Sequence, residues 1–304
     1  MDNVADVPRS LTVAEPLRKR KGPLYTAVRI LRQWPVFPIA ILVVLAITGA
    51  AAPLLAPFDP IRPELTARNA PPFWYADYDG RHFLGADFVG RDVLSRLIYG
   101  SQVSLMVVAI SLTSGMLVGT VLGLVAGYFG GHVDELITRT VDMWLAVPFI
   151  LVAFVVVIVF GQSLGVLMVL LALLAWVPFV RNVRAEAIVL RTREYVLLAR
   201  ISGASTSRIL SRHLLPNVLN TVVVIATLRV GGLILTESIL SFLGAGIPPP
   251  TPAWGVMVSD GRNYLNDAWW ISFFPGMAIL LVVMAFNFIG DWLRDRLDPR
   301  LRQL

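Results

Sequence analysis

The sequence predicts an all-α integral membrane protein with six membrane-spanning helices. Three observations support this fold class. The chain of 304 residues is 56% hydrophobic, only 15% of its residues are charged, and charge is absent from several long apolar runs. A water-soluble domain needs a more polar surface than this composition supplies. The absence of cysteine excludes thiol chemistry, and three histidines far apart in sequence predict no metal site.

Each predicted span is a run of the length that a bilayer requires, since a hydrocarbon core of about 30 Å needs about 20 apolar residues in a helix. Three uncharged runs each predict one crossing: residues 36–56, 97–131 and 268–290. Residues 143–180 are also uncharged but too long for one crossing. The turn-prone residues 161–163 interrupt this run, so two helices are predicted there. Residues 214–243, apolar except for Arg229 and Glu237, complete the six.

The distribution of arginine and lysine predicts the orientation of these spans. Residues 1–35 carry seven basic residues against three acids, and residues 181–213 carry seven arginines against two acids. Both segments are therefore expected on the cytoplasmic side, and both termini with them. Residues 57–100 and 244–267 lack such an excess and are expected outside. The arginines lie in short stretches between apolar runs, so the net charge of +6 does not indicate a nucleic-acid partner.

The first apolar run has a second interpretation as a cleaved secretory signal. Basic residues precede it, and the small residues 50–52 resemble a cleavage site. The run is longer than the usual signal core of about 7–15 residues, which favours an uncleaved membrane anchor.

A ladder of glycines on the second predicted span indicates close helix packing. The glycines recur every fourth residue at Gly115, Gly119, Gly123, Gly127 and Gly131. Small residues at this spacing let the backbone of another helix approach closely. The partner is expected to be a helix of this chain or of a second subunit.

Two charged residues lie inside the fifth predicted span, Arg229 and Glu237. They share roughly one face of the helix, because eight residues make a little over two turns. A charge facing lipid costs several kcal/mol, so each is expected to face a bundle interior, an aqueous cavity or the membrane interface. Both are candidates for a transport pathway, and an outer headgroup position is the alternative for Glu237.

The basic loop before the fifth span is patterned as helix, turn and helix. Apolar residues lead to Gly203, which is a typical helix stop, and Ser205 or Thr206 can cap a second helix. An apolar face outside the membrane needs a partner protein to bury it, or else the helical pair lies on lipid headgroups.

The residues of this loop resemble a known family. Residues 194–205, followed by Ile209 and residues 212–217, resemble the EAA loop of binding-protein-dependent ABC importer permeases. Residues 84–96, 237–255 and 293–300 resemble segments of the C-type subunit in the dipeptide, oligopeptide and nickel subfamily. The resemblance covers all but about the first 25 residues.

This resemblance implies a type I ABC importer permease fold and a transport role. It implies a second homologous permease, two cytoplasmic ATPases that bind ATP and magnesium, and a periplasmic or lipid-anchored substrate-binding protein. The chain itself has no GxxxxGK[ST] phosphate loop, so it is expected to be non-catalytic and to bind no cofactor. The residues that the family pattern assigns to ATPase coupling are Glu194, Leu197, Leu198, Ala199, Gly203, Ala204, Ile209 and Pro216.

The sequence departs from the family pattern at one position of this loop. Leu197, Leu198 and Ala199 stand where the family has glutamate, alanine and alanine. The acidic residue that can pair with a basic group of the ATPase is therefore missing at Leu197. Glu194 lies one helical turn earlier, close enough to replace it.

The resemblance also implies the domain organisation and further contacts. Four segments are expected: a cytoplasmic N-terminal segment at 1–35, a first span with a periplasmic loop at 36–98, a permease core at 99–291 with its coupling loop at about 191–217, and a cytoplasmic tail at 292–304. Candidates for the binding-protein contact are Arg91, Asp92, Trp254 and Gly255, which could instead only plug the periplasmic mouth.

The expected function is import of dipeptides or oligopeptides across a bacterial inner membrane. Nickel chelates or another small solute remain alternatives within the same machinery. An ion-coupled secondary transporter is the alternative from another class, although such proteins usually carry ionisable residues in several spans.

Overall fold

The computed structural model describes residues 35–78 and 80–297. Most of the predicted N-terminal segment 1–35 and the end of the predicted tail 292–304 lie outside the described residues. Residues 37–304 form a compact unit separate from residues 1–36, and the following concerns this unit. Its described part is all-helical apart from one isolated bridge between Ala86 and Asp92.

Within the described residues, four helices are long and apolar enough to cross a membrane: α4 (Val93–Phe129), α7 (Leu164–Leu190), Thr206–Phe242 and α12 (Trp270–Leu297). The third comprises α9 (Thr206–Ile209), η2 (Leu210–Leu214) and α10 (Leu215–Phe242). The pair α5 (Gly131–Ala146) and α6 (Phe149–Phe160) passes the same test together, with a bend of 83° between them. The helix α2 (Val36–Ala50) is apolar but only 15 residues long. The predicted number of six crossings is reached only if the bent pair and α2 each cross the membrane in addition to the four long helices. Six crossings therefore stay a prediction.

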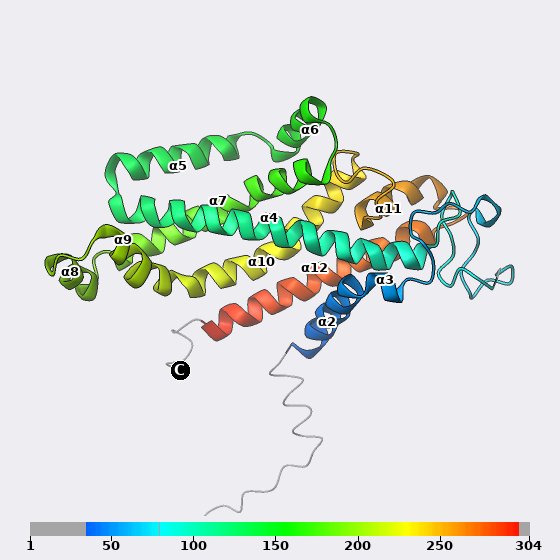
Figure 1. Cartoon of the computed structure of the whole chain (residues 1–304), viewed down its shortest axis with the longest axis horizontal. Helices are drawn as coiled ribbons and strands as arrows, with labels where there is room; N and C mark the ends of the chain where they lie inside the picture. Colours follow the sequence, from blue (N-terminus) through cyan, green and yellow to red (C-terminus); the bar gives the residue numbers. More distant parts are fainter. Residues whose placement is uncertain (1–34, 79, 298–304) are drawn as a thin grey trace, which may run out of the picture. The chain divides into compact units, whose positions relative to one another are not determined.

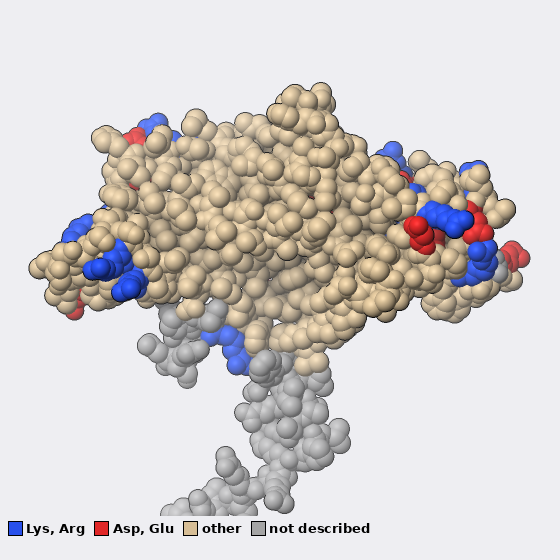
Figure 2. Space-filling model, viewed as in Figure 1, with Lys and Arg blue, Asp and Glu red and all other residues tan. Residues whose placement is uncertain are grey.

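The shorter elements lie in the connections: α3 (Ala52–Leu55), η1 (Leu65–Ala67), α8 (Glu194–Ile201), α11 (Trp254–Gly261) and η3 (Arg262–Tyr264). Figure 1 shows α8 and α9 at one end of the helical bundle and the loop before α4 at the other. The charged side chains visible in Figure 2 gather toward these two ends, and the surface between them is almost uncharged. This distribution fits a protein whose middle lies in hydrocarbon.

The predicted pair of helices in residues 143–180 is confirmed in part. α6 ends at Phe160, and Ser163 caps α7 by accepting a hydrogen bond of 3.1 Å from the Val166 amide. The first helix of the pair, however, is only 12 residues long. Pro148 explains this difference, because the residue before a proline is disfavoured in helical conformation and the chain turns there.

Four glycines of the predicted ladder pack α4 against α7, so their partner is a helix of the same chain (Figure 1). The prediction was wrong for the fifth, Gly131, which is the first residue of α5 and has no atom within 4 Å of where its Cβ would be. A Cβ on Gly115 would lie 2.5 Å from the Cβ of Ala175, and one on Gly127 would lie 2.6 Å from the Cβ of Ala187. Gly119 and Gly123 face α7 in the same way. Any larger residue would separate the two backbones.

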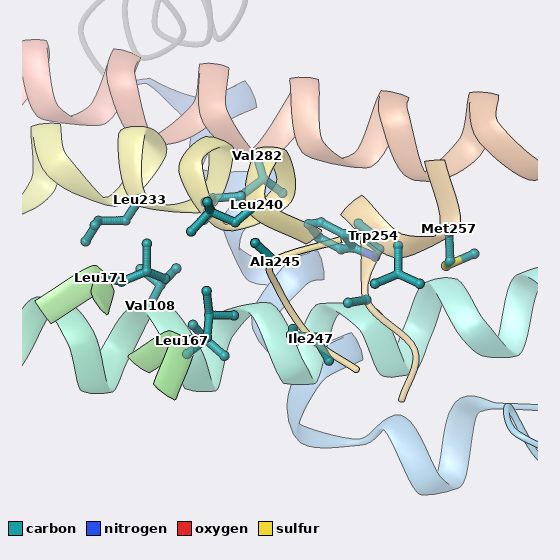
Figure 3. Packing of buried hydrophobic residues seen from close by; sticks show 14 of the residues in the cluster. Val108, Leu167, Leu171, Leu233, Leu240, Ala245, Ile247, Trp254, Met257 and Val282 are labelled. Atoms are coloured by element: carbon teal, nitrogen blue, oxygen red, sulfur yellow. The ribbon is translucent and has the colours of Figure 1, made fainter. Parts of the chain in front are cut away.

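The largest apolar core joins α4, α7, α10, α11 and α12. Figure 3 shows Leu167 and Leu171 of α7 beside Val108 of α4, with Leu233 and Leu240 of α10 across from them. On the outer face of α12, exposed apolar side chains recur every three or four residues at Phe273, Met277, Leu280, Met284 and Phe288. This stripe is typical of a helix surface that faces lipid.

Candidate functional site

The helix-turn-helix at residues 191–217 begins with an arginine that fixes the end of α7 to the end of α4. The guanidinium of Arg191 donates hydrogen bonds to the carbonyls of Gly127 and Tyr128, over 3.1 and 3.3 Å. These carbonyls belong to the last turn of α4, where a positive charge also complements the helix dipole. The turn that follows is therefore attached to two long helices.

The turn itself has the geometry that its sequence predicted. α8 ends at Ile201, and Gly203 adopts a φ of 78°, a left-handed conformation that favours glycine. The amide of Ala204 donates to the carbonyl of Ala199 over 3.0 Å, which closes the end of the helix. Ser205 then caps α9, its Oγ accepting from the Arg208 amide over 3.4 Å. The predicted cap is thus Ser205 rather than Thr206.

The second helix of the motif continues directly into the span. η2 is a π-helical turn, in which the amide of Leu215 donates to the carbonyl of Leu210. Pro216 follows in the first turn of α10. A proline removes one backbone donor and crowds the carbonyl four residues before it, and a π turn relieves this conflict. No break therefore separates the motif from α10.

The motif buries one side and exposes the other. Val196 and Ile209 are only 2% and 1% exposed and pack in a cluster with Tyr128, Val183 and Leu214. Leu198 and Ile201 are 63% and 83% exposed, and Leu197 is also exposed. We call Leu197, Leu198 and Ile201 the apolar ridge. Burying large apolar side chains is favourable, so an exposed group of them is a candidate surface for a partner.

Basic residues are frequent on the same motif, and Figure 2 shows Lys and Arg side chains at the end of the molecule where α8 and α9 lie. Four exposed arginines lie on the motif at positions 193, 200, 208 and 212. The guanidinium carbon of Arg200 lies 5.6 Å from the centre of the Tyr128 ring, a cation–π contact with α4. These arginines favour a partner with acidic groups around an apolar hollow.

The predicted coupling residues divide into contact and support positions. Glu194, Leu197, Leu198, Gly203 and Pro216 are exposed, and Ala199 and Ala204 are partly buried. Ile209 is buried in this chain and supports the turn from beneath. The exposed carboxylate of Glu194 lies in the first turn of α8, where the helix dipole favours a negative charge.

The two charged residues of α10 have different surroundings. Glu237 is 0% exposed, and its carboxylate accepts hydrogen bonds from the hydroxyls of Ser241 and Ser238 over 2.8 and 3.3 Å. It therefore lies inside the helical bundle and not at an exposed headgroup position. Arg229 is exposed and lines a groove between α7, α10 and α12.

The opposite end of the bundle carries a buried network of charged groups. Arg91 donates to Asp87 over 2.7 Å and lies 3.4 Å from the carboxylate of Asp260 on α11. Arg96 of α4 reaches the same two carboxylates at 3.5 and 3.6 Å. Burial raises the pKa of the Asp260 carboxyl, and the guanidinium groups of Arg96 and Arg91 oppose that shift by favouring its charged form. The network ties the loop before α4 to α11.

The candidates for binding-protein contact lie within this end and are buried. Asp92 caps α4 by accepting from the Ser95 amide over 2.7 Å, and its other oxygen lies 3.1 Å from Nδ1 of His82. Trp254 is 3% exposed and donates from its indole to the carbonyl of Leu97 over 2.9 Å. Arg91 and Gly255 are buried as well. The side chains of Arg91, Asp92 and Trp254 and the closely packed backbone of Gly255 hold this end together and are not exposed to another protein.

Sequence reasoning missed a set of ion pairs between α5 and α7. Arg184 bonds to both oxygens of Asp134, one of them over 2.6 Å, and Arg181 bonds to Asp142 over 2.7 Å. The sequence did contain a signal for these ion pairs. Residues 134 and 142 are both acidic and lie about two turns apart, so a helix places them on one face of α5. The described residues contain no group of three potential metal-binding side chains.

Long apolar helices, joined at one end by a helix-turn-helix with exposed apolar side chains, define a multi-span membrane protein. The chain belongs to the family of binding-protein-dependent transport system inner membrane components, whose profile matches residues 119–303. It is thus a permease component of an ABC importer.

Its relatives cover most of the chain. It is 39% identical to the dipeptide transport system permease protein DppC of Haemophilus influenzae, over 86% of this chain and 89% of the relative. It is 43% identical to DppC of Escherichia coli K12, over 82% and 83%. An inward-facing structure of the MetNI methionine ABC transporter superposes with a TM-score of 0.51 at 20% identity, over 67% of this chain and 96% of that one. This last likeness supports the type I permease fold.

Proposed function

We propose that this chain is one of two permease subunits in an ATP-driven importer of peptides, and that its α8–α9 turn couples it to ATPases. The observation that carries the coupling role is the apolar ridge, held outward on a turn whose other side is buried. The named function of the relatives supports dipeptides or oligopeptides as substrates. Nickel chelates and other small solutes are the alternatives within the same machinery.

The coupling mechanism follows from this two-sided construction. The apolar ridge fills a hollow of an ATPase, and the arginines of the motif meet acidic groups around it. Val196 and Ile209 fix the turn to the ends of α4, α7 and α10, so movement of the ATPase is passed to long helices. Closure on ATP thereby shifts the bundle between inward-facing and outward-facing states. This chain supplies no catalytic group to that cycle, which takes place in the partner ATPases with ATP and magnesium.

The same proposal assigns orientation and external contacts. The α8–α9 end is cytoplasmic, both termini lie on that side, and the chain crosses a bacterial inner membrane six times. A substrate-binding protein docks at the other end. Because Arg91, Asp92, Trp254 and Gly255 are buried, their role is to keep that end in shape, and exposed residues such as Phe83 and Trp74 make the contact.

Co-purification of the tagged chain with its partners tests the coupling role. We expect a second permease and ATPases to be recovered in mild detergent, and Gly203→Asp to lose the ATPases. Gly203 has a positive φ and open space beyond its Cα, so an aspartate strains the turn and projects into the partner's space.

Gly161→Asp is the matched control. Gly161 also has a positive φ, of 79°, and open surroundings, but it lies between α6 and α7. The Gly161→Asp protein should therefore retain the ATPases. Equal recovery from both variants would contradict the coupling role, and solute flux by the chain alone without ATP would contradict the importer assignment.

A further inference from the structure

The groove around Arg229 is a hollow with a polar lining in the membrane-spanning part of the described chain. Its volume is about 670 Å³, and it lies between α7, α10 and α12. Polar side chains from all three helices line it: Asn182, Asn220, Thr221, Arg229 and Arg294. Hydrocarbon offers no partner for these groups, so a groove of this kind is expected to face water, substrate or another protein chain.

Arg229 is a cation without a counter-charge in the described structure. Three other arginines of the described spans have carboxylate partners: Arg96 of α4 lies near Asp87 and Asp260, and Arg181 and Arg184 of α7 each bond to a carboxylate of α5. Arg229 forms no ion pair or side-chain hydrogen bond with any described residue. An unpaired guanidinium inside a span costs several kcal/mol unless something satisfies it.

The lining of the groove selects for negative charge. It contains two guanidinium groups and two amides that can donate, and no aspartate or glutamate among its described residues. Gly232, one turn beyond Arg229, has no atom within 4 Å of where its Cβ would be. Gly232 and Arg229 both line the groove, so this part of it is open to a ligand.

The depth of Arg229 distinguishes a transported ligand from a lipid headgroup. Fourteen residues separate it from Leu215 at the start of α10, which is about 21 Å at 1.5 Å per residue. That places Arg229 near the middle of the span, far from the headgroup level. Arg294, in contrast, lies in the last turn of α12. The groove thus runs from the middle of the bundle toward the end that carries the α8–α9 turn.

We propose that Arg229 is a substrate-binding residue that takes the terminal carboxylate of a peptide as it passes through the permease toward the cytoplasm. This inference rests on the proposed function, since it places a peptide in the groove. A guanidinium binds a carboxylate through two parallel hydrogen bonds, a geometry that lysine cannot reproduce. Asn182 and Asn220 supply amide partners for the peptide backbone, and Arg294 provides a second positive charge at the mouth.

The test compares two forms of one dipeptide in the assembled importer reconstituted with its partner subunits. Uptake of dialanine with a free carboxylate and of dialanine amide is measured for wild type and Arg229→Gln, each relative to the wild-type rate for that peptide. Loss of a charge-assisted bond should lower uptake of the free acid about ten-fold. Uptake of the amide should change by less than about two-fold, since it lacks the charge that Arg229 binds.

Arg139→Gln is the control, because Arg139 is an exposed arginine on α5 that pairs with Glu135 and lies outside the groove. It should transport both peptides as wild type does. If Arg229→Gln fails to assemble, Arg229→Lys gives the second measurement. A lysine ammonium keeps the charge but cannot form the two parallel hydrogen bonds of a guanidinium. Uptake of the free acid should therefore fall about three-fold, while uptake of the amide should not change.

Three results would overturn the inference. Equal effects on both peptides would show that Arg229 does not bind the carboxylate. An anionic phospholipid that co-purifies with wild type and is lost from Arg229→Gln, with the peptide ratio unchanged, would assign the groove to lipid. Loss of the second permease from Arg229→Gln and Arg229→Lys alike would make it a subunit contact. A wild-type complex that hydrolyses ATP but imports neither peptide would instead contradict the proposed substrate class.

Discussion

Substitution of Gly119 by alanine tests the packing of α4 on α7. A Cβ at this position would meet the main-chain oxygen of Trp176 and lie 2.7 Å from the Cβ of Phe179. Phe179 is fully buried, so neither neighbour can move aside without moving α7. Overpacking of this kind costs about 1–3 kcal/mol. The alanine also gains about 1 kcal/mol in helix propensity over glycine. Because the obstacle includes main chain, the cost should lie in the upper part of this range, about 2–3 kcal/mol, which leaves a net loss of about 1–2 kcal/mol.

Gly276→Ala is the matched control for this prediction. Gly276 lies within α12, and no atom comes within 4 Å of its missing Cβ. The same chemical change there gains helix propensity without a steric cost, so stability should rise by up to about 1 kcal/mol. The two variants are therefore expected to shift stability in opposite directions.

Thermal unfolding of the full chain in mild detergent measures both variants. A change of 1 kcal/mol shifts Tm by about 2–4 °C for a chain of this size, so Gly119→Ala should unfold about 2–8 °C below wild type. Gly276→Ala should unfold at or slightly above the wild-type temperature. A Gly119→Ala protein that is as stable as wild type, or shifts in Tm of the same sign for both variants, would refute the packing argument.

Three further substitutions test the contacts at the two ends of the bundle. Arg191→Met removes two hydrogen bonds to the end of α4 and should cost about 1–3 kcal/mol in thermal unfolding, whereas the exposed Arg193→Met should cost little. Trp254→Phe removes the indole hydrogen bond and should lower the free energy of unfolding by about 1 kcal/mol. Trp74→Phe, at an exposed site, should leave that free energy within about 0.5 kcal/mol of wild type. Asp92→Ala removes the cap of α4 and should speed hydrogen exchange in its first turn by about five-fold or more, and Asp92→Asn, which can still cap, should restore most of the protection. Equal effects in any variant and its control would contradict the assigned contact.

Local sequence signals predicted the turn at residues 191–217 well. A glycine after an apolar helix and a serine two residues later act through their own backbone conformations, and Gly203 and Ser205 behave as expected. Similarly, Gly161 and Ser163 separate α6 from α7 at the predicted place. Such signals are readable because the forces involved act within one or two helical turns.

The candidate contacts of the outer end were not predictable in the same way. Arg91 and Trp254 look like surface recognition residues in a loop, yet both are buried by helices distant in sequence. Asp260, which lies 3.4 Å from Arg91, is 169 residues away along the chain. Burial of that kind depends on which segments meet, and no local pattern records it.

The sequence by itself determined the membrane class, the family and the position of nearly every apolar helix, because the absence of charge over about 20 residues is a local requirement of hydrocarbon. Only the tertiary structure decided where the charged and small residues face. It pairs the glycines of α4 with α7, encloses Glu237 among serine hydroxyls and leaves Arg229 open on a groove. The physical reason is that a helix presents several faces at one depth, and packing against other helices selects which face is buried.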